Sequence, residues 1–213
     1  MKLVAEGISK SWGATHVLRG LEFTAEPGSL TALTGGNGTG KTTLIRVLAT
    51  ILRPDDGKLS LGELDYRADA LKVRGLIGYL GHESMLDAAM SMRENLQMFA
   101  ALYGVADARA RAEALITRFE ADRFADLPVS ELSRGQEQTA ALSRALLHKP
   151  KLLLLDEPST GLDKSARERL WLAARDQAKA GAAVIFSTHD HDSAASVADR
   201  VVEMRDGKLH AAI

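Results

Sequence analysis

A glycine-rich stretch constrains this chain more than any other feature. The run GGNGTGKT at 35–42 fits the pattern G-x-x-x-x-G-K-[ST], with Gly35, Gly40, Lys41 and Thr42 at its fixed positions. A short apolar segment precedes it and apolar residues at helical spacing follow it, which is the strand–loop–helix setting that the pattern requires. Backbone N–H groups freed by the glycines, the positive end of the following helix and the Lys41 charge would all face one anion. The run therefore predicts a cradle for nucleotide phosphates, with the Thr42 hydroxyl as a ligand for Mg²⁺.

The remaining pattern predicts an α/β fold with a mostly parallel sheet, because short apolar segments alternate with segments of helical spacing. We expect strands at 4–12, 30–35, 58–62, 77–80, 152–157 and 182–189, helices at 44–52, 91–103, 107–124, 136–148 and 164–180, and a final hairpin at 199–210. Pro54 and Gly181 are expected to end two of the helices. The chain is predicted to form one domain, with a core at 1–83 and 149–213 and a helical insertion at about 84–148.

Two acidic residues follow the most apolar strand. The stretch LLLLDE at 152–157 places Asp156 and Glu157 at the carboxyl end of that strand, where ligands gather in open parallel sheets. A strand that ends in two acids is common and by itself does not indicate a function. The phosphate cradle upstream favours a functional role for these two acids. We expect Asp156 to hold Mg²⁺, directly or through water, and Glu157 to be the general base that polarises the attacking water.

Composition excludes several classes of protein. The chain has no cysteine, so disulfides, cysteine-ligated zinc and cysteine nucleophiles are excluded. Its 27 Lys and Arg residues against 28 Asp and Glu residues do not indicate a nucleic-acid binder. Charges at Lys2, Glu6 and Lys10 interrupt any apolar signal core, and no window approaches the ~18 apolar residues of a membrane span. If the protein acts at a membrane, we expect another chain to cross it.

Further motifs resemble those of ATP-binding-cassette (ABC) ATPases. The segment LSRGQ at 132–136 resembles the LSGGQ signature, STGLD at 159–163 resembles the D-loop, and STHD at 187–190 resembles the switch segment. Trp12 stands where that family has an aromatic residue that stacks on adenine. The resemblance covers essentially the whole chain. It implies a P-loop NTPase (RecA-like) core with a mostly parallel sheet, an N-terminal antiparallel β subdomain and a helical insertion.

The resemblance also implies roles for individual residues. The triphosphate and metal would be bound by Gly35, Gly36, Asn37, Gly38, Thr39, Gly40, Lys41, Thr42 and Thr43. Lys41, Glu157 and His189 would be catalytic, with His189 contacting the γ-phosphate. Ser133, Gly135 and Gln136 would reach the γ-phosphate of ATP held by a second subunit. A serine and a bare glycine at a helix start form another anion-binding end, so two subunits would have to close head to tail around each ATP.

Simpler interpretations exist for several of these residues. Trp12 can be an ordinary aromatic residue of a strand, His189 a surface histidine, and Ser133 a helix N-cap. His191, just beyond the switch segment, is expected to be merely exposed. The arginine-rich helix over 107–123 is expected to present a solvated face.

The sequence departs from the ABC pattern at two places. The signature has Arg134 where glycine is usual, a position that we expect to be peripheral to the phosphate. The segment YLGHES at 79–84 lacks the glutamine that links Mg²⁺ and water to the partner interface in the family. Glu83 falls at that place as a nucleotide and metal contact, and a shift of one residue would choose His82 instead. A carboxylate can ligate Mg²⁺ but cannot donate an amide proton, so turnover can differ from the family's.

We therefore expect the ATP-binding subunit of an ABC transporter, with ATP and Mg²⁺ as cofactors. It would act in a dimer with a second ATP-binding subunit, bind a separate transmembrane permease and lie at the inner face of the cell membrane, with no nucleic acid as partner. The YLGH segment and short length are similar to short exporters, including the haem exporter subunit of cytochrome c maturation. The alternatives are a soluble ABC ATPase acting on nucleic acid or ribosomes, and a regulatory cassette with weak turnover.

Overall fold

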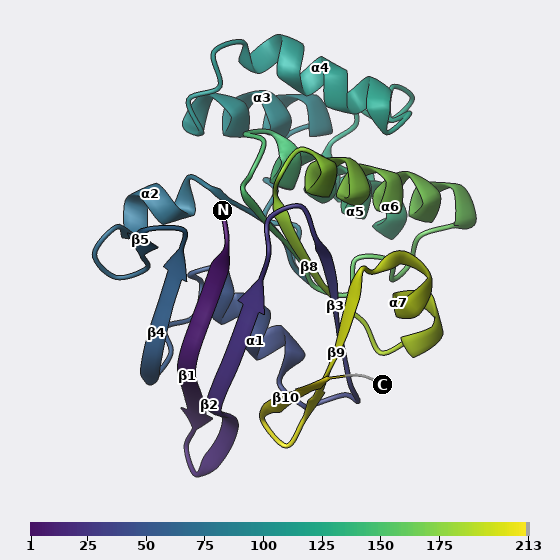
Figure 1. The fold of residues 1–213 in the computed structure, drawn as a ribbon. Coiled ribbons are helices and arrows are strands. Elements are labelled where there is room, and N and C mark those ends of the chain that lie inside the picture. The colour runs from purple at the N-terminus through teal and green to yellow at the C-terminus, as the bar shows by residue number, and fades with distance from the viewer. Residues whose placement is uncertain (212–213) are drawn as a thin grey trace.

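A computed structural model describes residues 1–211, apart from the side chains of 192 and 193. The strands are β1 (Leu3–Trp12), β2 (Thr15–Ala25), β3 (Leu30–Thr34), β4 (Asp56–Leu61), β5 (Leu64–Asp65), β6 (Ile77–Leu80), β7 (Leu152–Leu155), β8 (Ala183–Ser187), β9 (Arg200–Arg205) and β10 (Lys208–Ala211). The helices are α1 (Lys41–Leu48), α2 (Ala70–Arg74), α3 (Met92–Leu102), α4 (Ala108–Arg118), α5 (Arg134–Leu146), α6 (Lys164–Lys179) and α7 (His191–Val197), with a 3-10 turn at Val129–Glu131 (Figure 1).

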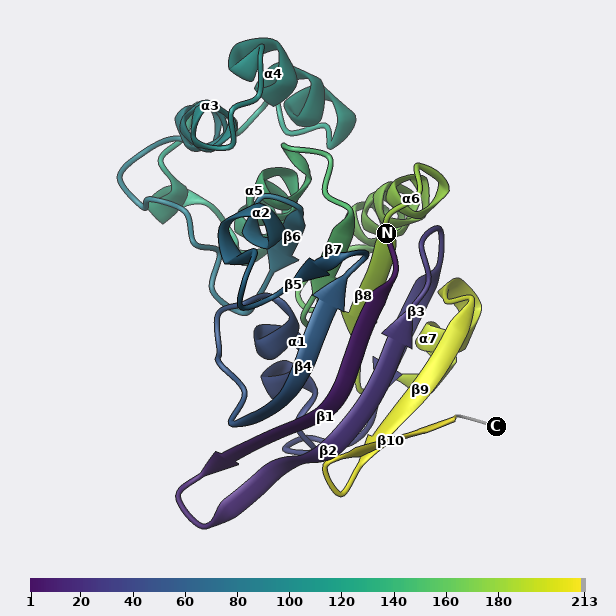
Figure 2. The same cartoon turned by 60° about the vertical axis from the view of Figure 1, so that its left-hand side comes forward.

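Two sheets enclose α1. The antiparallel sheet has the order β2-β1-β4-β5, and the larger sheet has the order β10-β9-β3-β8-β7-β6. All neighbours in the larger sheet pair in parallel except β9 and β10, which form the hairpin expected at the end of the chain. Figure 2 shows α1 between the two sheets. The predicted mostly parallel core sheet and N-terminal antiparallel part are therefore confirmed.

Strand β7, an inner strand of the larger sheet, is apolar on both faces because both faces are buried. Leu152 and Leu154 belong to the cluster around α1, whereas Leu153 and Leu155 belong to the cluster formed with α5 and α6. All four side chains are fully buried. A continuous apolar run is the pattern of a parallel strand covered on each side, and it places the carboxyl end of β7 at the edge of the core.

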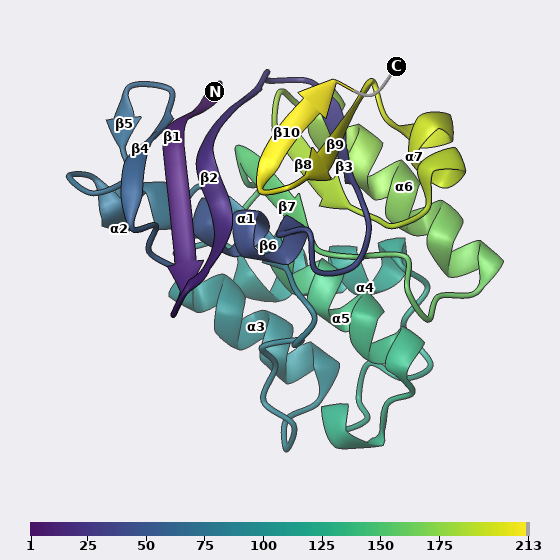
Figure 3. The ribbon, with the colours of Figure 1, turned by 90° about the horizontal axis from the view of Figure 1, so that it is seen from below.

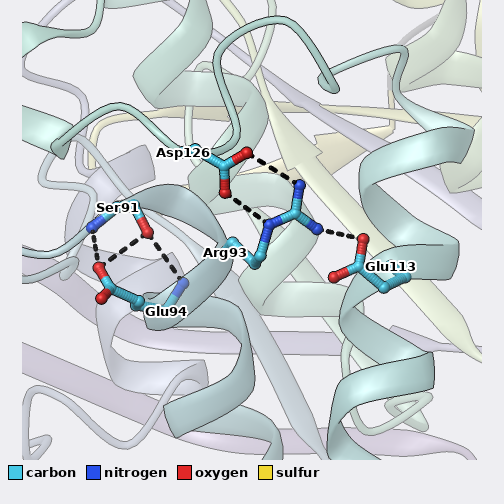
Figure 4. A network of polar contacts seen from close by, with 5 residues as sticks. All are labelled: Ser91, Arg93, Glu94, Glu113 and Asp126. Atoms are coloured by element: carbon cyan, nitrogen blue, oxygen red, sulfur yellow. Dashed lines mark hydrogen bonds and ion pairs between the residues drawn. The ribbon is translucent and has the colours of Figure 1, made fainter.

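The helices α3, α4 and α5 gather on one side of the sheets (Figure 3). Polar contacts fix the start of α3 against its neighbours (Figure 4). Ser91 and Glu94 form a capping box, and the Arg93 guanidinium bonds both Asp126 and Glu113 of α4. Within the described residues, no helix is long and apolar enough to span a bilayer.

Several elements differ from the expectations. Strands β2 and β5 and the short helices α2 and α7 were not predicted. Helix α1 ends at Leu48, before Pro54 can act, because Thr50 adopts a left-handed φ of 62° and the Ile51 amide turns back to the Arg46 carbonyl. Gly181, with φ 89°, does follow the end of α6 as predicted.

The arginine-rich helix α4 is not only a solvated face, so that expectation was wrong in part. Arg111 is half-buried, and its guanidinium donates to the carbonyls of Leu146 and Leu147 at the end of α5. These last carbonyls of a helix lack partners within it, and a cation at that end is favourable. Arg111 therefore ties α4 to α5.

His148 gives the fold a measurable acid sensitivity. Its ring stacks on Tyr103 at 4.0 Å, Nε2 donates to the Ile77 carbonyl, and burial lowers its pKa to about 4. The group is neutral when folded but takes a proton when unfolded below its ordinary pKa of ~6.5. Neutral His148 therefore makes its full contribution to the free energy of unfolding above pH ~6.5. That free energy falls by up to about 3 kcal/mol as the pH drops toward 4. Urea denaturation between pH 7 and 4.5 should show a smaller loss of stability for His148→Phe than for the wild type, and equal losses would contradict this.

Candidate phosphate-binding and catalytic cleft

The glycine-rich loop joins β3 to α1 as the sequence predicts. Gly40 is the N-cap of α1, and the ammonium group of Lys41 lies buried inside the loop. Lys41 Nζ donates to the carbonyls of Gly35 at 2.8 Å and Gly36 at 3.0 Å. Thr39 Oγ1 also donates to the Gly36 carbonyl. The loop is thus closed around its own lysine. The first backbone N–H groups of α1, which have no partner within the helix, face the same loop.

Two neighbouring hairpins hold the loop from outside. A Cβ on Gly35, whose φ is 137°, would lie 2.5 Å from the Met204 carbonyl oxygen of β9. A Cβ on Gly40 would lie 3.1 Å from Met204 Sδ and from Val17 Cγ1 of β2. Glycine at Gly35 is therefore required by close backbone approach as well as by backbone angle, whereas at Gly40 it is favoured by a φ of 109° and by tight contacts that neighbouring atoms would have to relieve. The same contacts place the β1–β2 hairpin directly beside the phosphate cradle.

We predict that Gly35→Ala will disrupt the loop far more than Gly38→Ala. Both residues have positive φ, but a Cβ on Gly38 would meet nothing within 4 Å. Gly38→Ala should therefore cost about 1 kcal/mol from backbone strain alone, whereas Gly35→Ala should cost roughly 2–4 kcal/mol because β9 must shift. Chemical denaturation of the two variants measures the difference. Equal stabilities would show that Gly35 is not tightly enclosed.

The two acids at the end of β7 are brought to the loop. Thr42 Oγ1 donates to Asp156 Oδ1 at 3.1 Å, and Ser187 Oγ of β8 donates to the same oxygen at 2.6 Å. The Glu157 amide donates to Ser187 Oγ at 2.9 Å, and His189 Nδ1 lies 3.2 Å from Glu157 Oε2. Ser187 therefore fixes both acids at once. Glu157 also has a φ of 48°, an uncommon backbone conformation that often occurs at functional sites.

A cleft of about 690 Å³ opens over these groups. Its walls include the predicted residues Asn37, Thr42, Asp156, Glu157 and His189. The remaining wall comes from Arg46, Gly81, His82, Ser84, Arg134, Glu137, Gln138 and Thr160. The structure thus brings the loop, the acids and the histidine into one open site of a size that suits a nucleotide.

The signature residues lie elsewhere in the same chain. Ser133, Gly135 and Gln136 line a separate hollow of about 520 Å³, together with Gly161 and Asp163. Ser133 is also the N-cap of α5, since Ser133 and Gln136 form a capping box. Within one chain these residues do not line the phosphate cleft. That placement is compatible with the predicted role toward a second subunit.

The geometry of the cleft bears on three more of the predicted site residues. Glu83 is exposed and is not among the residues that line the cleft, whereas His82 lines it, so the geometry favours His82 over Glu83 at this position. Arg134 lines the cleft of its own chain as well, and its place relative to a phosphate in a second subunit stays a prediction. Thr43 is half-buried on α1 and, like Gly38 and Lys41, is not among the residues that line the cleft, so its role toward the triphosphate stays a prediction.

Trp12 lies at the end of the β1–β2 hairpin with 57% of its surface exposed. It pairs with Thr15, two residues before the Val17 that touches the phosphate loop, and Lys10 Nζ lies 5.4 Å from its ring centre. A largely exposed indole beside a phosphate cradle is available to stack on a base. The adenine-stacking role stays a prediction.

Sequence reasoning missed the residues that support the site. Ser187 was read only as part of the switch motif, although a serine at the end of a buried strand was a usable signal. Tyr79 is a second case: burial and the nearby Asp156 charge raise the pKa of its hydroxyl. No local pattern predicted that Tyr79, Arg46 and Asp156 would approach one another.

The fold and this site define a P-loop nucleotide-binding protein. A family model described as ABC transporter matches residues 18–160, and the chain belongs to that family. It is 36% identical over 209 residues to the daunorubicin resistance ATP-binding protein DrrA3 of Streptomyces coeruleorubidus, covering 97% of this chain and 66% of that protein. It is 34% identical to the Nod factor export ATP-binding protein I of Burkholderia thailandensis, covering 94% of this chain and 67% of that protein.

Solved structures agree with this fold. The ATP-binding subunit of an ABC transporter superposes with a TM-score of 0.91 at 26% identity, covering 99% of this chain and 90% of that one. The dimeric structure of a bacterial ABC transporter cassette gives 0.89 at 23% identity, covering 98% and 96%, which bears on the fold alone. The chain spans about two thirds of the length of the curated relatives that it matches first.

Proposed function

We propose that this chain binds MgATP in the cleft and hydrolyses it to drive an ABC exporter. The observation that carries the proposal is the joining of the Thr42 hydroxyl, on the phosphate loop, to the Asp156 carboxylate at 3.1 Å. A nucleotide held by Lys41 and the α1 amides would present its terminal phosphate beside Glu157 and His189. Glu157 would then accept a proton from the attacking water, and His189 would contact the γ-phosphate.

The residues present fit a magnesium ion. Mg²⁺ prefers oxygen ligands and is usually held by one or two carboxylates together with phosphate oxygens and water. Thr42 and Asp156 offer such oxygens side by side, with Ser187 orienting the carboxylate. In the part of the chain that the structure describes, no three His, Asp or Glu side chains form a metal site by themselves. When bound, the ion would supply charge stabilisation on the transferring phosphate.

We propose that two such subunits close head to tail around ATP. Ser133 and Gly135 sit at the positive end of α5 and face a hollow outside their own cleft, so they are free to complete a site in a partner. With Glu157→Gln, in which we expect bound ATP to stay uncleaved, sedimentation should change from monomer to dimer on adding ATP. Adding Ser133→Arg should prevent the dimer, whereas Thr117→Arg, exposed on α4, should leave it unchanged. A dimer insensitive to Ser133→Arg would contradict this arrangement.

We further propose that a separate permease docks beside the helical region, at the inner face of the cell membrane. A groove there is lined by the exposed apolar side chains Ile51, Met85 and Leu102. It also contains Tyr79, whose hydroxyl crowds Gly81 at the rim of the phosphate cleft. A segment of the permease bound in this groove would therefore contact Tyr79, whose hydroxyl lies at the rim of the phosphate cleft. The two relatives named above bear names of export or drug resistance, which supports an exporter.

Purification from detergent-solubilised membranes tests the permease. We expect a multi-span membrane protein to copurify with the tagged wild type and to be lost with Leu102→Glu. The matched control is Leu172→Glu, another exposed leucine, on α6. Copurification with ribosomes or nucleic acid instead would favour the non-transport alternative.

A further inference from the structure

A second cavity lies apart from the phosphate cleft and shares no lining residue with it. It occupies about 320 Å³ between the end of α1, the β4–β5 hairpin and α2. That volume would hold roughly ten water molecules. The cavity is therefore large enough for a small organic ligand.

The floor of this cavity is apolar. It includes Val47, Leu52, Leu59 and the ring of Tyr66. Tyr66 is buried, and its hydroxyl is already used in a 3.1 Å bond to the Leu48 carbonyl. The aromatic face therefore offers apolar surface rather than a polar group.

The rim is strongly cationic. It is formed by Arg53, Lys58, Arg67 and Arg74, with Asp65 as the single acid among the lining residues. Asp65 is engaged by its own turn, since its carboxylate accepts the amides of Arg67 and Ala68. Within the described residues, none of the four cations forms a salt bridge. Four cations on one rim repel each other, and an anion would relieve that repulsion.

One of these cations is held in place by a strained residue. Arg74 Nε donates to Thr50 Oγ1 at 3.3 Å, and Thr50 is the β-branched residue with a φ of 62°. This conformation is a genuine outlier for such a side chain. Its hydroxyl orients Arg74 so that the terminal guanidinium nitrogens stay available for a ligand.

We propose that this cavity binds an amphiphilic phosphate or carboxylate, with its anionic group on the arginine and lysine rim and its apolar body against Tyr66 and Leu59. Arginine forks match both anions, and the apolar floor selects against the bare ion. The cavity shares Thr50 and Arg74 with the groove proposed for the permease. A membrane lipid and a free metabolite are both sources of such a ligand, because each can present an anionic group joined to an apolar body.

Calorimetry with octyl phosphate, below its micellar concentration, tests the site without ATP. We expect saturable binding at one site, at least tenfold tighter than inorganic phosphate or octanol. Arg67→Ala and Arg74→Ala should each weaken octyl phosphate about tenfold, whereas Arg109→Ala, an exposed arginine on α4, should have no effect. Absence of binding, or equal weakening by Arg109→Ala, would overturn the proposal.

Two further measurements separate this site from the phosphate cradle and identify the source of the ligand. Lys41→Ala should leave octyl phosphate binding unchanged, and loss of binding in that variant would overturn the proposal by placing the anion at the cradle. Flotation with phosphatidylglycerol vesicles, against phosphatidylcholine vesicles, tests a lipid source. Arg67-dependent flotation supports the lipid headgroup, and octyl phosphate binding without flotation supports a free amphiphile. Failure of ATP turnover would not affect either result.

Discussion

Replacing Glu157 with Gln should slow ATP hydrolysis by roughly 10²–10⁴-fold while ATP binding stays intact. The carboxylate stands at the carboxyl end of β7, with its amide held by Ser187 and one oxygen 3.2 Å from His189. An amide of the same size keeps the shape of the site but cannot accept a proton at neutral pH. Loss of turnover without loss of binding is therefore the expected signature of a general base.

The matched control for this variant is Glu168→Gln. Glu168 is exposed on α6, so its substitution changes charge equally without touching the cleft. Phosphate release should match the wild type in Glu168→Gln and be nearly absent in Glu157→Gln. Equal, negligible rates in the wild type and Glu157→Gln would remove the enzyme claim and favour a regulatory cassette.

Replacing Lys41 with Ala should weaken ATP binding about 100-fold or more. Lys41 is the buried cation of the phosphate loop, and charged hydrogen bonds to phosphate contribute about 1.5–3 kcal/mol each. Two such bonds to the β- and γ-phosphates account for the expected loss. Equilibrium dialysis with labelled ATP measures the change.

The stability of Lys41→Ala needs a control, because the ammonium group also bonds the carbonyls of Gly35 and Gly36. Lys41→Arg keeps the cation, and thermal melting of both variants reports whether the loop survives. If ATP affinity falls in Lys41→Ala while its melting temperature matches that of Lys41→Arg, the loss is one of phosphate recognition. Unchanged ATP affinity in Lys41→Ala would place the phosphate elsewhere.

The sequence predicted those parts of the site that depend on local pattern. The phosphate loop, β7 with its two acids, and the N-cap of α5 each follow from a few neighbouring residues with one physical reason. Strand β2 was missed because Gly20 and polar residues interrupt the alternation of apolar and polar residues that indicates a strand. The segment is extended because it pairs with β1 along its length. Helix α1 was predicted too long because the apolar spacing continues past Thr50, where the backbone turns.

The remaining features depend on contacts between distant segments. Ser187 and Asp156 are 31 residues apart, and Arg111 reaches the end of α5 across 35 residues. Glu83 and His82 could not be separated by sequence, because one residue of shift decides which side chain faces the cleft. The cationic cavity likewise joins three elements, so no single segment indicates it.

The central claim is that the loop around Lys41 binds a nucleotide beside Asp156 and Glu157. Titration of the purified chain with MgATP in a calorimeter tests it most directly. We predict saturable binding of one nucleotide per chain, which Lys41→Ala reduces strongly. A wild-type chain that gives no binding heat at millimolar MgATP, across several temperatures, would contradict the account.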